Sequence, residues 1–163
     1  MGGSRIAIRI SSYAPDNMAI KLIECDKQKS YKLAEYMNDI IIIQGDGRNV
    51  DLLKEEGIRD MDAFIALTDS SETNILACLT AKELGVKKTI AEVENIQFIS
   101  TAERLNIGNI INKKLLAASR IFQLLLDEDS SNAKCLALSD AEVVELVAKE
   151  NSKITKAAVK DLK

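Results

Sequence analysis

The residues nearest the start of the chain have types and a spacing that could bind a phosphate. Gly2, Ser4 and Ala7 stand where a dinucleotide-binding turn carries Gly, Gly and Gly or Ala. Small residues let the backbone approach a pyrophosphate, and the first turn of a helix offers free N–H groups and about half a positive charge. Serine weakens the pattern at its middle position and no strand-like run precedes it. A glycine–serine remnant of a cloning tag is therefore the alternative interpretation.

A carboxylate at the end of the next apolar run could complete such a site. Glu24 is the last residue of the run Ala19–Glu24. In dinucleotide-binding folds an acidic residue at this place accepts hydrogen bonds from the adenosine ribose hydroxyls, and it would repel a 2′-phosphate. The alternative is a solvated carboxylate that only ends a strand.

Polar residues and glycines follow the other strong apolar runs as well. They are Gly45 and Asp46 with Gly47, Thr68 and Asp69, and Glu92 and Glu94. Asp-Gly pairs are also ordinary turn chemistry, so Asp46 with Gly47 needs no ligand to explain it. Glu92 and Glu94 would face the same side of a strand.

These residues need a sheet to bring them together, and the hydrophobic pattern predicts one. The predicted strands are Ala19–Glu24, Ile40–Ile43, Ala63–Thr68, Thr89–Val93 and, more weakly, Asn109–Ile111. The predicted helices run from an Asn49 cap to Gly57, from an Asp69–Glu72 capping box to Gly85, and over Asn95–Leu105. Most of the strands lack polar alternation, as strands buried on both faces do. We therefore expect an α/β fold with a doubly wound parallel sheet, which binds ligands beyond the carboxyl ends of its strands.

The last third of the chain is patterned differently. Ile110–Leu126 is apolar on several helical faces, which favours either one deeply buried helix or a helix that also packs on another subunit. Asp127–Asn132 is the clearest linker. After it, Lys134–Leu138 and Ala141–Lys149 could form a hairpin around Ser139 and Asp140, or a helix could cover Ala141–Glu150.

Composition excludes several classes of function. With 22 basic and 25 acidic side chains the net charge is −3, so no nucleic-acid footprint is present. The chain has no histidine, which argues against a zinc site or a serine–histidine triad. No apolar run is long enough to span a membrane, and no signal peptide opens the chain. Cys25, Cys78 and Cys135 are expected as core residues in a reducing compartment.

Several segments together resemble the RCK (KTN) domain of the bacterial Trk potassium-uptake regulators, the TrkA family. They are IECD, IIIIQGDGRNVDLLKEEGI, DAFIALTDSSETNILACLTAKELG and NKKLLAASRI, which lie within residues 2 to 126 in the family's order. The resemblance implies a Rossmann-like lobe over residues 1–128 that lacks its first strand and includes a crossover helix. It also implies that residues 129–163 are the truncated start of a TrkA-C lobe.

The resemblance further implies a cytoplasmic regulatory module, not an enzyme, that binds NAD(H) or ATP/ADP. Phosphates would lie on Gly2, Gly3, Ser4, Arg5 and Ile6, the ribose on Glu24, the adenosine beside Asp26, Lys27, Gly45 and Asp46, and the far end beside Thr68, Asp69 and Glu94. Calcium sensing is disfavoured because Ala66 stands where the family's third acidic ligand would be. The implied partners are a membrane potassium-transport subunit at the inner face of the membrane and further copies of this chain, in a homodimer or a higher ring joined through Ile110–Leu126. The alternatives are the cofactor-binding part of an NAD-dependent oxidoreductase and a scaffold with a degenerate cleft.

Overall fold

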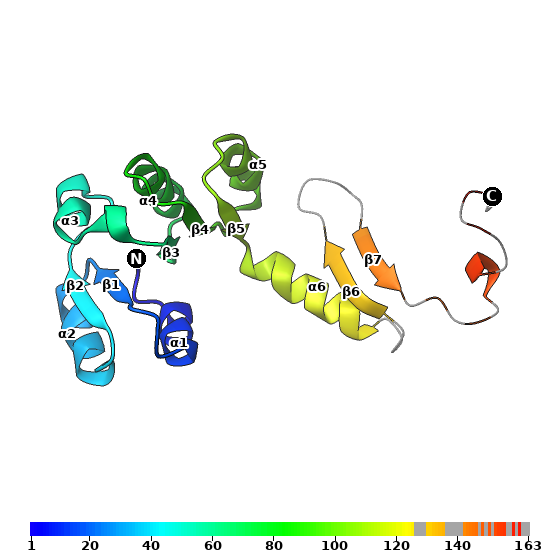
Figure 1. Ribbon diagram of the computed structural model, residues 1–163, viewed down its shortest axis with the longest axis horizontal. Helices are drawn as coiled ribbons and strands as arrows, with labels where there is room; N and C mark the ends of the chain where they lie inside the picture. The colour runs from blue at the N-terminus through cyan, green and yellow to red at the C-terminus, as the bar shows by residue number, and fades with distance from the viewer. Residues whose placement is uncertain are drawn as a thin grey trace. The chain divides into compact units, whose positions relative to one another are not determined.

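The computed structural model describes residues 1–125, 130–135, 142–146, 148, 150, 152–155, 158 and 160. These residues fall into two compact units, Met1–Asn112 and Lys113–Lys163 (Figure 1). The predicted boundary after residue 128 groups the long helix with the first unit, and it stays a prediction.

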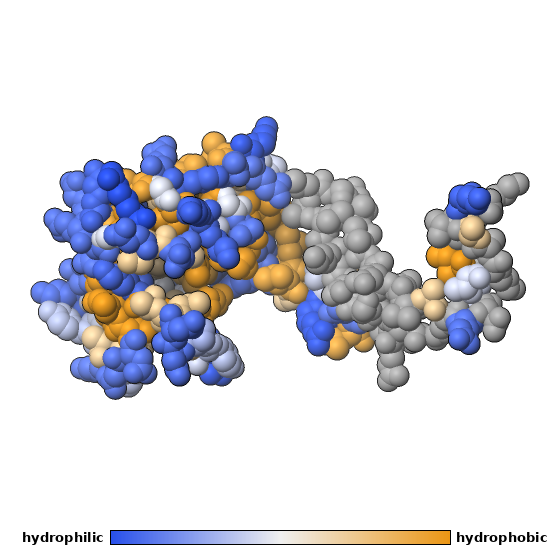
Figure 2. All heavy atoms as spheres, viewed as in Figure 1, coloured by the Kyte–Doolittle hydropathy of each residue, from blue (hydrophilic) through white to orange (hydrophobic). Residues whose placement is uncertain are grey.

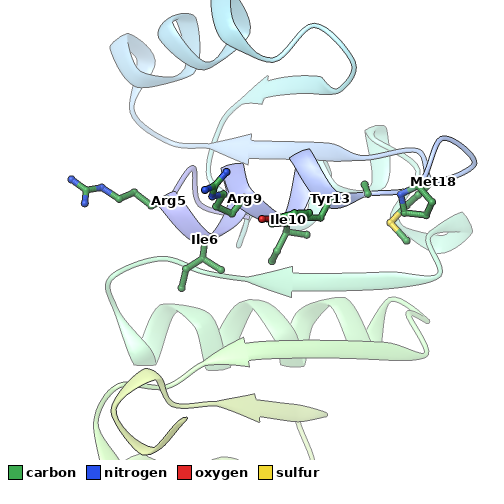
Figure 3. A pocket seen from close by; sticks show the side chains of 8 residues that line it. Arg5, Ile6, Arg9, Ile10, Tyr13 and Met18 are labelled. Atoms are coloured by element: carbon green, nitrogen blue, oxygen red, sulfur yellow. The ribbon is translucent and has the colours of Figure 1, made fainter. Parts of the chain in front are cut away.

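The first unit is built on parallel strands, as the sequence predicts. β1 (Lys21–Glu24) pairs with β2 (Ile41–Gln44), and β4 (Lys88–Glu92) lies between β3 (Ala63–Ala66) and β5 (Asn109–Ile111). The helices of this unit are α1 (Arg5–Tyr13), α2 (Lys27–Tyr36), α3 (Val50–Glu55), α4 (Ser71–Glu83) and α5 (Ile96–Arg104), with a 3₁₀ turn at Ile58–Asp60. The strand arrows point the same way in Figure 3, so their carboxyl ends lie at one edge.

Two residues join β1 to β3. The Met1 ammonium donates to the Ile65 carbonyl at 2.7 Å, and the Leu67 amide donates to the Met1 carbonyl at 2.9 Å, which is the hydrogen-bond pattern of a parallel ladder. On the other side, the Gly2 amide donates to the Ile23 carbonyl at 2.8 Å. Among the described residues no assigned strand lies between β1 and β3. Met1 and Gly2 therefore connect β1 and β3 by hydrogen bonds and keep the two sheets parallel.

The core beneath this junction fixes the first helix. Ala7, Leu22, Leu33 and Leu67 form one buried cluster, which packs α1 and α2 against β1 and the end of β3. Hydrophilic side chains cover most of the visible face of the first unit in Figure 2. The expectation that the strong strands are buried on both faces is wrong for β2. It is exposed at both ends and half-buried between them, because it pairs on one side only, with β1.

Helix boundaries confirm one predicted cap and correct another. Asn49 caps α3 by accepting hydrogen bonds from two backbone amides, and Gly57 follows the helix with a φ of 74°. The Asp69–Glu72 capping box is wrong. Ser70 caps α4, because its hydroxyl reaches the Thr73 amide at 3.1 Å while Asp69 stays exposed before the helix.

Asp26 and Lys27, which follow the predicted strand Ala19–Glu24, begin a helix that the sequence pattern did not predict. Asp26 caps α2 by accepting from the Lys29 amide at 2.8 Å, and Lys27 is the first residue of that helix. The helix was not predicted because its composition is mainly polar, and Ser30 and Leu33 are its buried residues.

The second unit contains α6 (Lys113–Leu125) and a hairpin of β6 (Ser130–Cys135) with β7 (Glu142–Leu146). The helix begins three residues later than Ile110, because residues 110 and 111 belong to β5 and pair with β4. The hairpin interpretation is confirmed over the paired residues, which overturns the alternative helix there. Part of the predicted linker, 130–132, lies in β6, while 127–129 and the predicted turn at 139–140 lie outside the described residues.

A short 3₁₀ turn, Lys153–Thr155, ends the assigned elements. None of the helices in the described part of the chain has both the length and the apolarity needed to cross a membrane.

Candidate functional site

The glycine turn leads directly into the first helix. Gly2 has a φ of +87°, and a Cβ at this position would lie 2.9 Å from the Leu67 carbonyl oxygen, so the turn requires glycine. Ser4 then caps α1 by accepting from the Ala7 amide at 3.3 Å. Ala7 is buried where the helix meets the sheet, as the third small position of the turn pattern requires. The sequence pattern at residues 2, 4 and 7 thus forms a tight turn that leads into a helix.

A hydrogen bond links this turn to the carboxylate at the end of β1. The Gly3 amide donates to Glu24 Oε2 at 2.8 Å. A Cβ on Gly3 would lie 2.8 Å from the same oxygen and would overlap the Leu33 side chain. The glycine turn and the carboxylate, which are 21 residues apart in the sequence, are therefore in direct contact at the end of β1. This contact depends on a glycine at position 3, a residue that the turn pattern does not specify.

Glu24 is buried, and its surroundings favour the ionised carboxylate. The Asp26 amide donates to its Oε1 at 3.0 Å, and Lys29 Nζ lies 3.0 Å from its Oε2. Burial alone would raise the pKa of Glu24, but hydrogen bonds from Asp26, Lys29 and Gly3 outweigh burial and lower the pKa to about 2. The Cys25 thiol is 3.5 Å from Oε1, and Cys25 is exposed, contrary to the expected core position. Both oxygens of this carboxylate already accept hydrogen bonds.

The loop after β2 lies next to the end of β1. The Gly45 amide donates to the Glu24 carbonyl at 2.9 Å, which brings this loop beside the end of β1. Asp46 is exposed and forms an ion pair with Arg48 at 2.7 Å, which lowers the pKa of the Asp46 carboxyl. Gly47 is packed so tightly that an added Cβ would lie 2.5 Å from the Met1 sulfur.

Thr68 borders the glycine turn from the β3 side, because its methyl group lies 3.0 Å from where a Gly2 Cβ would be. Its hydroxyl donates to Asn74 Oδ1 at 2.7 Å, and its amide donates to the same oxygen at 3.0 Å. Asn74 is fully buried and also donates to the carbonyls of Thr68 and Glu92, at 2.9 and 2.8 Å. Sequence reasoning missed Asn74, although an amide inside the apolar stretch of α4 is a visible signal.

Glu94 lies in a second network at the ends of β4 and β5. Its amide donates to Ser71 Oγ at 3.0 Å, and its carbonyl accepts from Asn112 Nδ2 at 3.0 Å. Asn112 also donates to the Val93 carbonyl at 2.7 Å, which ties the segment after β5 to the end of β4. Asn112 was likewise missed. Through Asn74 and the Glu92 carbonyl, this network adjoins the Thr68 side of the crevice.

The predicted site residues therefore divide by position. Gly2, Gly3, Ser4, Glu24, Asp26, Gly45 and Thr68 form one contiguous set. Lys27 and Asp69 are exposed, and their roles stay predictions. Arg5 and Ile6 line a separate pocket of about 540 Å³ along α1, with Arg9, Ile10, Tyr13, Ala14, Pro15 and Met18. Figure 3 shows Arg5 extending away from the helix.

The start of α1 has features that suit a phosphate. The backbone of Gly2 and Gly3 packs closely against the Leu67 carbonyl, the Leu33 side chain and Glu24, and α1 begins directly after this turn, so the positive end of the helix lies beside it. The described residues contain no group of three or more Cys, Asp or Glu that could hold a metal ion.

Comparison with known proteins identifies relatives of the first unit and beyond. The model of the TrkA-N domain family matches residues 1–113. The Trk system potassium uptake protein trkA homolog 1 of Methanosarcina mazei is 32% identical over 139 residues, which is 85% of this chain and 34% of that protein. Trk system potassium uptake protein TrkA of Vibrio alginolyticus is 31% identical over 166 residues, covering 100% of this chain and 36% of that protein. The chain thus spans about a third of the length of these relatives.

Solved structures share the fold at low sequence identity. The GsuK RCK domain superposes with a TM-score of 0.67 at 15% identity, covering 75% of this chain and 27% of that one. The GsuK structure bound to ADP gives 0.56 at 16% identity, covering 76% and 30%. The GsuK channel bound to NAD gives 0.56 at 17% identity, covering 79% and 22%. These likenesses establish a Rossmann-like fold.

Proposed function

Because the chain belongs to the TrkA-N domain family, we propose that it is a nucleotide-binding regulatory domain that controls a membrane potassium transporter or channel. The hydrogen bond from the Gly3 amide to Glu24 carries this proposal. It joins a phosphate-binding turn to a ribose-binding carboxylate, and these two halves must converge for one nucleotide to use both.

In this proposal the phosphates lie on the turn and the first amides of α1, at residues 2 to 6. Glu24 accepts from the ribose hydroxyls, while Asp26, Lys27 and Asp46 border the adenosine. Thr68, Asp69 and Glu94 border the far phosphate or the second ribose. The ligand class is NAD(H) or ATP/ADP. Structures of the same fold are described as bound to ADP and to NAD, which supports the class without choosing within it.

Regulation requires that the nucleotide bind two arrangements of the assembly with different affinity. A coupling free energy of roughly 1–3 kcal/mol would change the ratio of the two arrangements about 5- to 150-fold. We place the subunit contact on the segment Ile110–Leu126. Exposed apolar side chains of α6 support this placement: Leu116, Ile121, Leu124 and Leu125. The partner is a membrane potassium-transport subunit, and the domain acts from the cytoplasmic face.

Thermal unfolding with ADP, ATP, NADH and NADPH tests the proposal. A ligand at about 100 times its Kd stabilises the folded state by ~2.7 kcal/mol, which raises Tm by roughly 5–11 °C for a chain of this size. Calorimetric titration of Glu24→Gln should then show about tenfold weaker binding of the stabilising nucleotide. Glu56→Gln is the matched control, because Glu56 is a carboxylate paired with Lys21 outside the crevice. No shift with any nucleotide would contradict the proposal.

The alternative function, the cofactor-binding part of an NAD-dependent oxidoreductase, makes an opposite prediction. A regulatory domain binds NADH without consuming it, whereas an oxidoreductase would oxidise it in the presence of a carbonyl substrate. Loss of NADH absorbance with any of a panel of small 2-oxo acids would favour the enzyme.

A further inference from the structure

Lys29 sits at the position where the ribose of a nucleotide would meet the protein. It is the third residue of α2, and its half-exposed ammonium lies 3.0 Å from Glu24 Oε2. The other charged or backbone donors to this carboxylate, the amides of Gly3 and Asp26, are fixed by the chain. Lys29 is therefore the donor that can move away when ribose hydroxyls arrive.

The charge around this point balances only when Lys29 is included. Between positions 24 and 29 the chain carries two carboxylates, Glu24 and Asp26, and two ammonium groups, Lys27 and Lys29. The Asp26 side chain accepts from the Lys29 amide at 2.8 Å, so all these charges lie around the first turn of α2. Without Lys29 the segment would be net negative and would repel a phosphate on the ribose.

We infer that Lys29 determines ribose specificity. Its positive charge neutralises Glu24, so that a nucleotide with a ribose 2′-phosphate can also bind. This inference rests on the proposed nucleotide site. Glu24 on its own is expected to reject a 2′-phosphorylated nucleotide. With Lys29 beside it, the arriving 2′-hydroxyl replaces the ammonium on Oε2, and the released ammonium contacts the ligand. When the ligand carries a 2′-phosphate, that ammonium forms a charge-assisted hydrogen bond with it.

The geometry makes a neighbouring lysine a poor substitute. Lys32 is exposed one turn further along α2, and none of the contacts described for this part of the chain joins its ammonium to Glu24. Among the described residues, Lys29 alone combines an ion pair with Glu24 and a side chain that reaches solvent. Lys32→Met is therefore the matched control for Lys29→Met, since both remove one positive charge from the same helix.

Two ligand pairs isolate the 2′-phosphate. NADH and NADPH differ only in this group, as do 5′-AMP and adenosine 2′,5′-bisphosphate. Titrations at one fixed salt concentration would measure Kd for all four with the parent chain, Lys29→Met, Lys29→Arg and Lys32→Met. Reduced nicotinamide fluorescence serves the first pair, and calorimetry serves the second.

We expect the parent chain to bind NADPH within about tenfold of NADH. Lys29→Met should weaken the 2′-phosphorylated ligand of each pair by roughly 10- to 100-fold, the range for a hydrogen bond to a charged group, while the other ligand changes less than threefold. Lys29→Arg should preserve the parent ratio within about threefold, and Lys32→Met should leave it unchanged.

Two results would overturn the inference while leaving the proposed function intact. One is discrimination of more than 100-fold against NADPH by the parent chain, and the other is an unchanged ratio in Lys29→Met. Failure of all four ligands to bind any variant would instead overturn the nucleotide site itself, and the role of Lys29 with it.

Discussion

The buried carboxylate at the end of β1 should make folding stability depend on pH in a way that one substitution removes. In the folded chain, hydrogen bonds from Asp26, Lys29 and Gly3 outweigh the opposing effect of burial and hold the pKa of Glu24 at about 2, against 4.5 as its ordinary value. A carboxyl whose pKa is lowered by folding stabilises the folded state at pH values above its unfolded pKa. That contribution is lost as the pH falls through the window from 4.5 towards 2.

The magnitude follows from the two pKa values. A tenfold change in proton affinity corresponds to about 1.4 kcal/mol, so the ionised Glu24 contributes on the order of 3 kcal/mol at neutral pH. Glu24→Gln has no such contribution at any pH. The free energy of unfolding of the parent chain should exceed that of the variant by about this amount at pH 7. The excess should decline steadily below about pH 4.5 and be small near pH 2.

Urea unfolding at pH 7, 5.5, 4 and 3 measures this difference. Titrating groups that do not interact with Glu24 cancel in the comparison. The buried Met1 ammonium, whose pKa is about 6, is an exception because the charge of Glu24 raises that pKa, so the test rests on the change between pH 5.5 and pH 3. A difference that stays constant from pH 7 to pH 3 would refute the reasoning. It would mean that the glutamine variant loses only packing, and that the donors around Glu24 do not favour its ionised form.

Three further substitutions test the local structure. Gly2→Ala should destabilise the chain by roughly 1–3 kcal/mol in urea unfolding, because the position combines a positive φ with close contact against backbone atoms. A loss of stability below about 0.5 kcal/mol would contradict that conformation. Asn74→Ala removes the hydrogen-bond partner that the Thr68 amide and hydroxyl share, so we expect a loss of about 2–4 kcal/mol in stability. An unchanged free energy of unfolding would exclude the buried network. Ser70→Ala should cost about 1 kcal/mol in the same assay and Asp69→Ala less than half of that; the reverse order would restore Asp69 as the cap of α4.

The parts of the fold that periodicity predicts are those where local sequence decides the outcome. Short runs of β-branched residues mark β1 to β5 because such runs suit strands covered on both faces. Whether a strand is central or at an edge depends on its pairing, which is why the exposure of β2 was not foreseen. Helix α2 was not predicted because its burial, too, depends on tertiary packing. Its few buried residues leave almost no apolar stripe to detect.

The candidate site was predictable in its outline and less so in its contacts. Glu24 and Thr68 could be predicted because they end predicted strands, and ligand-binding residues lie at the carboxyl edge of a parallel sheet. Asn74 and Lys29 came only from the structure. Each acts through a side chain directed at a residue five or six positions earlier, across the turn from strand to helix. Neither spacing belongs to a helix or a strand, so no periodic pattern reveals it.

The hydrogen bonds that Glu24 already accepts determine how much affinity a nucleotide would gain from its ribose at the proposed site. Because both oxygens already accept hydrogen bonds, ribose hydroxyls would replace the Lys29 ammonium, and the gain is the difference between two hydrogen-bonding arrangements. The amides of Gly2 and Gly3 already donate, to the Ile23 carbonyl and to Glu24 Oε2, so the phosphates would be held by the next amides at the start of α1, where the positive end of the helix favours an anion. Most of the binding free energy should therefore come from the phosphates, with the ribose contact supplying selectivity. Adenosine should then bind far more weakly than ADP, by at least 100-fold in a calorimetric titration. Equal affinities would mean that the glycine turn does not bind phosphate.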